Sequence, residues 1–209
     1  MIIHDCEQGT PEWFKVKAGV PSSSNAAMLV SGTGKASTQI DKYAMRLALE
    51  KNFGGPIDDG FGGNKYTDRG VELEALSRAD YAMTRQVEIQ EVGFITDDLM
   101  QFGASTDGLV GDDGVVEFKN IIATTMGDLI LYLDRNNGQT PPTYIPQLQM
   151  ELLVTSRKWV DIIFYHPQFE PIIHRHTPDP KFQALLKSQI KQVLAERNRL
   201  AKILKPYQL

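Results

Sequence analysis

The sequence contains a single cysteine, Cys6, among its 209 residues. One cysteine cannot form an intramolecular disulfide, which excludes the class of small secreted domains stapled by disulfides. The N-terminal residues MIIHDCEQ also lack the basic and then apolar pattern of a secretory signal. Together these features predict a protein of a reducing cytoplasm.

Long apolar runs are absent as well. A membrane-spanning helix needs about 18 or more consecutive apolar residues, whereas the most apolar stretches here, such as residues 162–165, are only the length of a strand. Hydrophobic residues make up 42% of the chain and charged residues 23%, which is typical of a folded globular protein. We expect one domain over residues 1–209 and no membrane partner.

Positive charge is in short supply, with 22 basic against 26 acidic residues and a net charge of −4. This balance argues against a protein that binds nucleic acid by covering it with positive charge. The argument weakens if carboxylates are clustered to hold divalent cations, because bound cations reverse the charge locally. The placement of the charges therefore matters more than their sum.

Several familiar catalytic motifs are missing. The sequence has no GxSxG nucleophile elbow and no motif that supports a cysteine nucleophile. The segment at residues 31–36 resembles a phosphate-binding loop, but Leu29 occupies the first glycine position and Ala36 replaces the Ser or Thr that would hold Mg²⁺. His174 and His176 can share a strand face, yet without a third ligand they are more typical of a surface than of a zinc site.

Hydrophobic periodicity predicts an α/β fold, a mixed central β-sheet flanked by α-helices. A helical part is expected over about residues 1–85, with a short capped helix at residues 25–30 and a loop at residues 58–66. Further predicted helices lie between Thr38 and Gly54, at residues 69–83, 126–135 and 144–155, and, as a long C-terminal helix, at about residues 180–204. Predicted strands lie at residues 87–95, 100–105, 115–119, 159–165 and 172–176.

One predicted hairpin carries the residues with the clearest chemistry. Glu117 and Lys119 are two positions apart on a strand, so their side chains share one face while Phe118 points into the core. Asp107 lies ten positions before Glu117, across a turn at residues 112–114 that would join the strands at residues 100–105 and 115–119. This hairpin can bring the two carboxylates together.

Two neighbouring carboxylates repel each other unless a cation lies between them, and oxygen ligands favour Mg²⁺ or Mn²⁺. Such an ion lowers the pKa of bound water and neutralises charge on a phosphate, while Lys119 can orient the nucleophile. The pattern therefore predicts phosphodiester hydrolysis. In the alternative interpretation, Asp107 belongs to an ordinary turn and Glu117 and Lys119 form the solvated face of a strand.

The segments STDGL (residues 105–109) and VEFKN (residues 116–120) resemble the metal-binding core of the restriction-endonuclease-like, or PD-(D/E)xK, nucleases. The resemblance is specifically to phage recombination exonucleases of the lambda-exonuclease type, the YqaJ-like viral recombinases, and extends from about residue 7 to residue 165. It implies a restriction-endonuclease-like core in which Asp107, Glu117 and the backbone carbonyl of Phe118 bind Mg²⁺, with Mn²⁺ as a possible substitute.

The same resemblance implies a further acidic ligand on an earlier helix. The segment RGVELEA (residues 69–75) matches the family motif with Glu74 as that ligand, and Glu72 is the competing choice. Glu74 shares a helix face with apolar residues, where an unpaired carboxylate would be costly. The alternative is an exposed Glu74 that pairs with Arg78.

The segment YIPQLQ (residues 144–149) is similar to a family helix that places a tyrosine and a glutamine beside the catalytic strand. Tyr144 and Gln147 lie three positions apart on one helical face and could hydrogen-bond a phosphate or the catalytic lysine. The alternative is an ordinary helix start without a catalytic role.

Near the N-terminus, residues 13–24 (WFKVKAGVPSSS) are similar to the family segment that holds a terminal 5′-phosphate, with Trp13, Lys17, Ser22 and Ser24 as the candidate binding residues. A serine hydroxyl and backbone N–H groups at a helix start form a good anion site, which a nearby cation strengthens. The family more often has arginine at the position of Lys17, and lysine lacks its bidentate fork. The alternative is a plain helix cap with a surface lysine.

The resemblance implies an exonuclease, encoded by a phage or prophage and acting in the bacterial cytoplasm, that digests one strand of linear double-stranded DNA. Digestion would start at a 5′-phosphorylated end, release mononucleotides and leave a 3′ overhang. Family members are homotrimeric rings that partner with a single-strand annealing protein. Two rival functions are an endonuclease of the same fold and a DNA-binding assembly protein without catalysis.

Overall fold

A computed structural model describes residues 1–57 and 68–207 of the chain, with backbone only for residues 68–72. The loop expected over residues 58–66 therefore lies outside the described residues. The α-helices are α1 (Pro11–Lys17), α2 (Ile40–Phe53), α3 (Asp68–Arg85), α4 (Ala123–Arg135), α5 (Ile145–Thr155) and α6 (Pro180–Leu204), and the short 3-10 helices are η1 (Ser23–Met28), η2 (Pro142–Tyr144) and η3 (Lys205–Tyr207).

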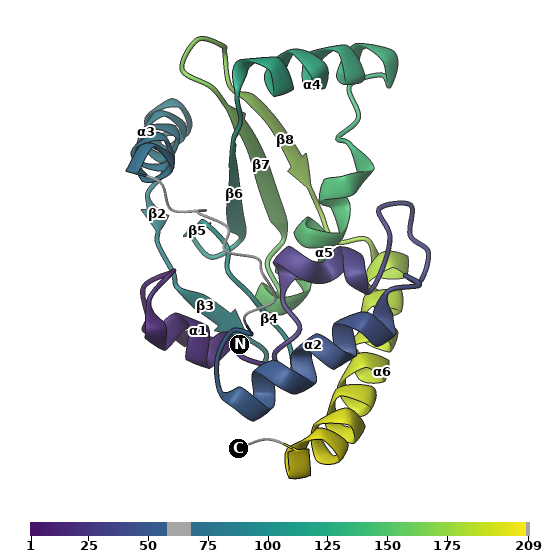
Figure 1. Cartoon of the computed structure of the whole chain (residues 1–209). Helices are drawn as coiled ribbons and strands as arrows, with labels where there is room; N and C mark the ends of the chain where they lie inside the picture. The colour runs from purple at the N-terminus through teal and green to yellow at the C-terminus, as the bar shows by residue number, and fades with distance from the viewer. Residues whose placement is uncertain (58–67, 208–209) are drawn as a thin grey trace.

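The strands form two sheets. The larger one has the order β2-β5-β6-β7-β8, in which β6 and β7 are parallel and the other neighbours antiparallel; the smaller one is antiparallel, in the order β1-β3-β4. The strands are β1 (Ile2–His4), β2 (Ile89–Gln90), β3 (Phe94–Thr96), β4 (Gly103–Ala104), β5 (Gly108–Val110), β6 (Gly114–Asn120), β7 (Trp159–Tyr165) and β8 (Ile172–His176). The expected mixed sheet flanked by helices is confirmed (Figure 1).

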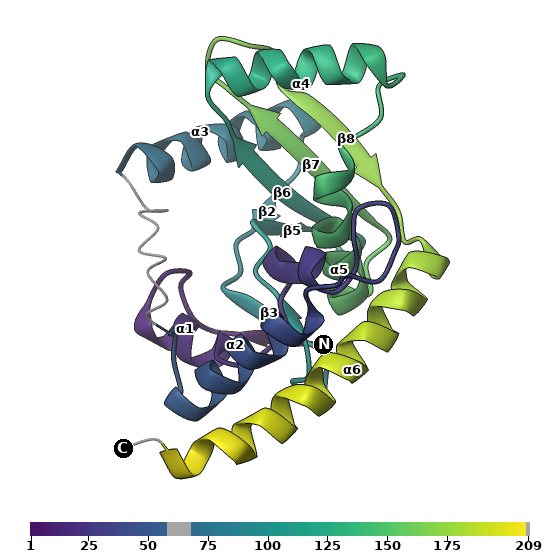
Figure 2. The ribbon, with the colours of Figure 1, turned by 45° about the vertical axis from the view of Figure 1, so that its right-hand side comes forward.

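Helices cover both faces of the larger sheet because the side chains of β6 and β7 alternate between two cores. Val115 and Ile162 belong to the larger core, which α5, α2 and α6 complete. Phe118 and Ile163 point to the other face and pack with Tyr81 of α3. Figures 1 and 2 show α3 on one side of the sheet and α5 on the other.

The C-terminal helix α6 begins at Pro180, after Asp179, whose carboxylate accepts hydrogen bonds from the backbone N–H groups of Lys181 and Phe182. It runs beside α2 (Figure 2) and buries an apolar stripe that includes Phe182 and Leu186. In the described part of the chain, no helix combines the length and the apolar character that crossing a membrane requires.

The strand expected over residues 87–95 is wrong as a single element. Its two ends form β2 and β3, which belong to different sheets. The break lies near Gly93, where a Cβ atom would come within 1.7 Å of the backbone oxygen of Cys6. The N-terminal segment thus packs directly on the chain where it passes from one sheet to the other. β1 in that segment was not expected, because three residues carry too little periodicity.

The partner strand of the predicted hairpin is also corrected. Residues 100–105 contain only the short strand β4, which pairs with β3 in the smaller sheet. The strand that pairs antiparallel with β6 is β5, Gly108–Val110. The sequence does not predict β5, because it has only three residues and follows an Asp-Gly turn signal. The turn after Val110 does reverse the chain as predicted.

Arg157 stabilises this turn from the end of α5. Its Nη1 donates hydrogen bonds to the backbone oxygens of Val110, Gly111 and Gly114 at 3.2, 2.6 and 2.9 Å. Replacing Arg157 with methionine is therefore expected to lower the free energy of unfolding by about 1–3 kcal/mol, because these carbonyl groups lose their donor. Denaturant unfolding monitored by circular dichroism measures the change.

A matched control is the neighbouring residue, Lys158, whose exposed ammonium pairs with Asp113 at 2.8 Å. Lys158→Met should change stability much less, because an exposed ion pair contributes little. Equal losses in the two variants would contradict the proposed role of Arg157.

Candidate active site

The β5–β6 hairpin places Asp107 beside Glu117. The register pairs Gly108 with Val116, so Asp107, one residue before β5, lies across from Glu117. The Oδ2 atom of Asp107 accepts a hydrogen bond from the backbone N–H of Phe118 at 2.6 Å. This bond fixes the Asp107 carboxylate at the edge of the strand that carries Glu117 and Lys119.

The residues on either side of Asp107 explain why the chain turns here. The buried hydroxyl of Thr106 accepts from the backbone N–H of Gly108 at 3.1 Å and lies 3.2 Å from the carbonyl oxygen of Val116. A Cβ atom on Gly108 would come within 2.2 Å of Ile89, so a glycine is required for close packing. The Thr-Asp-Gly sequence thus allows the tight local packing that places the Asp107 carboxylate beside β6.

Glu117, Lys119 and Gln147 form one hydrogen-bonded network. The ammonium of Lys119 lies 2.6 Å from Oε1 of Glu117, and it donates to Oε1 of Gln147 at 3.1 Å. The Nε2 group of Gln147 donates to the same Glu117 oxygen at 2.6 Å. The strand residues therefore share one face, as their spacing predicts, and α5 supplies the third member.

Burial and neighbouring charges shift the pKa values of the ionisable groups in and beside this network. Desolvation and the nearby Glu117 carboxylate raise the pKa of Asp107 well above its usual range, although the Phe118 N–H and Lys119 act against the shift. Burial lowers the pKa of Lys119, but the carboxylates of Glu117 and Asp107 outweigh it and raise that pKa. The ammonium stays charged, while the two carboxylates repel each other.

The carboxylate pair fits a divalent cation. Glu117 is only 4% exposed, and its Oε2 atom is buried without a hydrogen-bond partner among the described residues. A buried carboxylate oxygen next to a second carboxylate is unfavourable unless a cation joins them. Hard oxygen donors of this kind suit Mg²⁺ or Mn²⁺. The backbone of Phe118 lies between Glu117 and Lys119, while its side chain packs in the core behind the sheet.

Glu74 hydrogen-bonds to Arg78 rather than joining the Asp107–Glu117 pair. Its side chain is 40% exposed, and its carboxylate pairs with Arg78 at 2.8 Å, which is the alternative considered from the sequence. It is still near enough to contribute to the raised pKa of Asp107. Among the described residues, no three carboxylate, histidine or cysteine side chains are arranged as a metal-binding group. The side chain of Glu72, the competing choice, lies outside the described part.

Tyr144 stands at the start of α5, one turn before Gln147. Its ring packs edge-on against Phe164, with centroids 5.1 Å apart. Phe164 is the β7 residue that pairs with Lys119 in the sheet register. Tyr144 is therefore close to β6, but it is Gln147 that makes the contact with Lys119.

The candidate phosphate-binding residues lie in two groups. The Lys17 ammonium lies 4.1 Å from the ring centroid of Trp13 on α1, and the indole N–H donates to Gly93 O and Ser105 Oγ, both at 3.1 Å. The hydroxyls of Ser22 and Ser24 lie 3.3 Å apart.

The short helix beside these serines differs from the prediction. It is the six-residue 3-10 helix η1 rather than a helix at residues 25–30, and the side chain of its N-cap residue Ser22 makes no capping hydrogen bond. Both groups contact residues 103–105. Ser22 forms an isolated β-bridge with Gly103, and the indole N–H of Trp13 donates a hydrogen bond to Ser105. That stretch leads directly to Asp107.

The sequence matches the YqaJ-like viral recombinase domain over residues 12–158. The chain belongs to this family. No curated protein sequence gives a significant match. The family is the one that the hairpin motif resembles, so the resemblance is confirmed.

Solved structures agree with the family. This YqaJ-like chain is similar to LHK-Exo, an alkaline exonuclease from Laribacter hongkongensis, with a TM-score of 0.78, 29% identity, and coverage of 95% of this chain and 97% of that one. The LHK-Exo complex with dAMP gives the same values. A phage related exonuclease from Haemophilus somnus 129PT shares the fold, with a TM-score of 0.68, 14% identity and coverage of 88% and 96%. The family and the likeness to LHK-Exo indicate that the YqaJ-like chain is a nuclease.

Two buried acids of this chain were missed from the sequence. Glu151, fully buried on α5, accepts a hydrogen bond from Gln147 Nε2 at 2.9 Å. Asp161, 1% exposed on β7, accepts from Tyr81 of α3 at 2.7 Å and from Arg175 of β8 at 2.7 and 2.8 Å. A lone acid within an apolar run was the available signal in each case. Asp161 ties the helix that carries Glu74 to the sheet.

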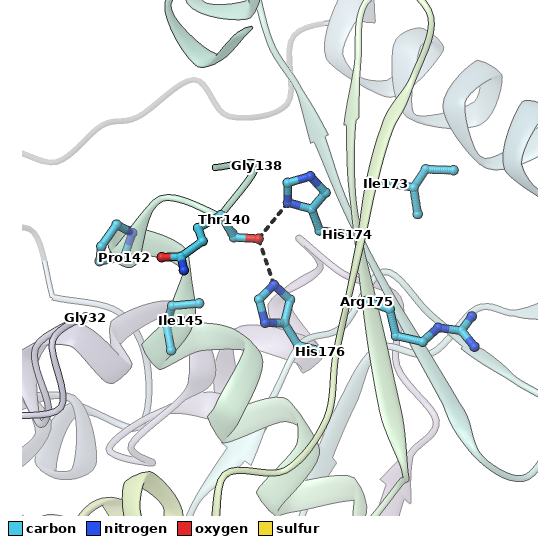
Figure 3. Close-up of a pocket in the computed structure, with 10 residues that line it drawn as sticks. Gly32, Gly138, Thr140, Pro142, Ile145, Ile173, His174, Arg175 and His176 are labelled. Atoms are coloured by element: carbon cyan, nitrogen blue, oxygen red, sulfur yellow. Dashed lines mark hydrogen bonds between the residues drawn. The ribbon is translucent and has the colours of Figure 1, made fainter. Parts of the chain in front are cut away.

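The histidine pair is also placed differently from the prediction. His174 and His176 are half-buried rather than surface residues, and both rings lie within hydrogen-bond distance of the Thr140 hydroxyl, at 2.7 and 2.8 Å (Figure 3). They line a cavity of about 580 Å³ beside β8, while Arg175 points away from them to the other face. The pair contacts Thr140 in the segment before α5.

Proposed function

We propose that the chain is a Mg²⁺-dependent exonuclease that digests one strand of linear double-stranded DNA from the 5′ end to mononucleotides, leaving 3′ overhangs. The observation that carries the proposal is the hairpin that sets Asp107 and Glu117 side by side with Lys119. The relative that binds dAMP supports release of mononucleotides. Membership of a viral recombinase family supports a role in recombination by single-strand annealing.

In this mechanism Asp107, Glu117 and the carbonyl of Phe118 would hold Mg²⁺, and Glu74 would complete the acidic shell after leaving Arg78. The ion would neutralise negative charge on the phosphate and lower the pKa of bound water. Lys119, held between Glu117 and Gln147, would orient the attacking water through its N–H groups.

The Lys17 and Ser22 region would bind the terminal 5′-phosphate. Lys17 supplies a cation, and Ser22 and Ser24 supply hydroxyl donors. The chain between Gly103 and Ser105 connects both groups to Asp107, so a phosphate bound there would set the distance to the scissile bond. This connection would be the physical reason why digestion starts at an end of the duplex.

Replacing Lys17 with alanine is expected to reduce the preference for a 5′-phosphorylated over a 5′-hydroxyl end by about tenfold, because one charge-assisted contact is lost. Initial rates on the two substrates measure the preference. Lys15→Ala is the matched control, since Lys15 is exposed on the same helix. An unchanged preference in the Lys17 variant would remove this residue from the phosphate site.

The function itself is tested with linear duplex DNA labelled at either 5′ or 3′ ends, with Mg²⁺ or with a chelator. The expected result is Mg²⁺-dependent release of labelled mononucleotide from the 5′ label first. A covalently closed circular duplex should remain intact. Cutting of the circle would instead show an endonuclease, and DNA binding without any product would show an assembly protein.

The assembly expected for this enzyme is a homotrimeric ring that encloses DNA, acting in the bacterial cytoplasm with a single-strand annealing protein. Enclosure would allow binding despite the net charge of −4. Gel filtration with light scattering measures the stoichiometry, and a monomer at working concentration would exclude the ring.

A further inference from the structure

Glu151 lies deeper than the residues assigned to the reaction. It occupies α5 one turn after Gln147 and is fully buried. Its Oε1 atom accepts from Gln147 Nε2 at 2.9 Å, and its Oε2 atom has no hydrogen-bond partner among the described residues. Its neighbours on the helix, Leu148, Met150 and Leu152, are buried apolar residues.

A carboxylate is an unfavourable choice for this position if only stability matters. An apolar side chain would pack with the same core without the cost of removing a charge from water. Glu117 lies close enough to act on Glu151 electrostatically, and Glu151 in turn acts on Lys119. The acid therefore belongs electrostatically to the Glu117–Lys119 network.

The amide of Gln147 has two ends that need opposite partners. Its Nε2 group faces two acceptors, Oε1 of Glu117 and Oε1 of Glu151, and its Oε1 atom faces the ammonium of Lys119. A flipped amide would turn its oxygen toward the two carboxylates and its N–H groups toward the ammonium. Glu151 adds a second acceptor that disfavours this flip.

We propose that Glu151 is a positioning residue, which fixes the amide of Gln147 so that its oxygen receives Lys119 and its N–H receives Glu117. The inference rests on the proposed nuclease function. Glu151 acts through Gln147 rather than on the metal or the DNA. Its effect is to hold the ammonium of Lys119 where the reaction needs it.

The test compares Glu151→Leu, Glu151→Gln, Gln147→Ala and the double variant of Gln147→Ala with Glu151→Leu. Glu151→Leu is expected to lower kcat about tenfold to a hundredfold with KM for DNA nearly unchanged. Glu151→Gln should restore at least about a third of wild-type kcat, because its amide oxygen can still accept from Gln147. In the Gln147→Ala background, Glu151→Leu should have less than about a twofold further effect.

Gln149→Leu is the matched control for loss of a buried polar group on the same helix. Gln149 bonds to Thr177 and Asp179 instead of the catalytic network. It should lose stability without the loss of kcat seen in Glu151→Leu. Additive effects of the Gln147 and Glu151 changes would overturn the proposal. A weakened Mg²⁺ affinity in Glu151→Gln, measured by calorimetry, would also overturn it and make Glu151 a metal ligand.

A readout without activity separates this inference from the proposed function. In protein labelled with ¹³C at lysine Cε, the Lys119 signal is identified by its loss in Lys119→Met. Glu151→Leu should move this signal, Glu151→Gln should move it less, and the double variant should match Gln147→Ala. If wild type fails to digest DNA, the proposed function fails while these shifts still decide the positioning role. Unmoved shifts in Glu151→Leu would overturn the positioning role alone.

Discussion

Replacing Lys119 with alanine is expected to lower kcat by about a thousandfold or more while the chain still folds. The Lys119 ammonium lies 2.6 Å from Oε1 of Glu117, and it donates to Oε1 of Gln147 as well. The variant removes the ammonium that, in the proposed mechanism, orients the attacking water and supports charge on the phosphate. Single-turnover digestion of an end-labelled duplex at saturating Mg²⁺ measures the loss of the chemical step.

Two further variants make the Lys119 result specific. Lys119→Arg should not restore the rate, because a planar guanidinium cannot occupy the position of a compact ammonium between Glu117 and Gln147. Lys158→Ala, at a residue immediately before β7 whose exposed ammonium pairs with Asp113, should leave kcat unchanged. Circular dichroism must show the native spectrum for all three proteins. A rate above about one per cent of wild type in Lys119→Ala would exclude this lysine from the chemistry.

The β5–β6 hairpin of the candidate site could be predicted because its signals are local. Two positions of separation on a strand put Glu117 and Lys119 on one face, and a turn signal between Asp107 and Glu117 reverses the chain. The structure has both features, although the partner strand is Gly108–Val110 rather than residues 100–105. The wrong partner strand did not change the predicted pairing of Asp107 with Glu117, because the turn, not the length of the strand, sets the register of the hairpin.

The rest of the site depends on contacts that no local pattern encodes. Glu151 is linked to Glu117 through Gln147, across 30 residues of sequence between Glu117 and Gln147. The pairing of Glu74 with Arg78 could be stated from helical spacing, but only as one of two alternatives. The division of residues 87–95 between two sheets occurs where Gly93 packs against Cys6, a contact between distant segments.

Replacing Asp107 with asparagine is expected to abolish Mg²⁺-dependent digestion, with a loss of about a thousandfold, and yet to stabilise the metal-free protein. Asparagine can still accept from the Phe118 N–H, and it removes the repulsion with Glu117. In a chelator, unfolding should therefore require about 1 kcal/mol more than wild type, or roughly 2–4 °C in Tm for a chain of this size.

The pH dependence of that stabilisation has a definite sign. The pKa of Asp107 is raised in the folded protein, so in the window between its unfolded and folded values the native state binds more protons than the unfolded state. Wild-type stability without metal should fall as the pH rises through this window, and the advantage of Asp107→Asn should disappear below the ordinary pKa of an aspartate. Thermal unfolding in a chelator from acidic to neutral pH measures both curves.

Magnesium should reverse the order of the two proteins. A cation that binds the Asp107 and Glu117 pair only in the folded state raises the Tm of wild type with concentration, whereas Asp107→Asn should respond weakly. Asp113→Asn, an exposed acid in the turn of the same hairpin, should follow wild type in both media. If Asp107→Asn is less stable than wild type in the chelator, the two carboxylates do not repel each other, and the reason to place a cation between them is lost.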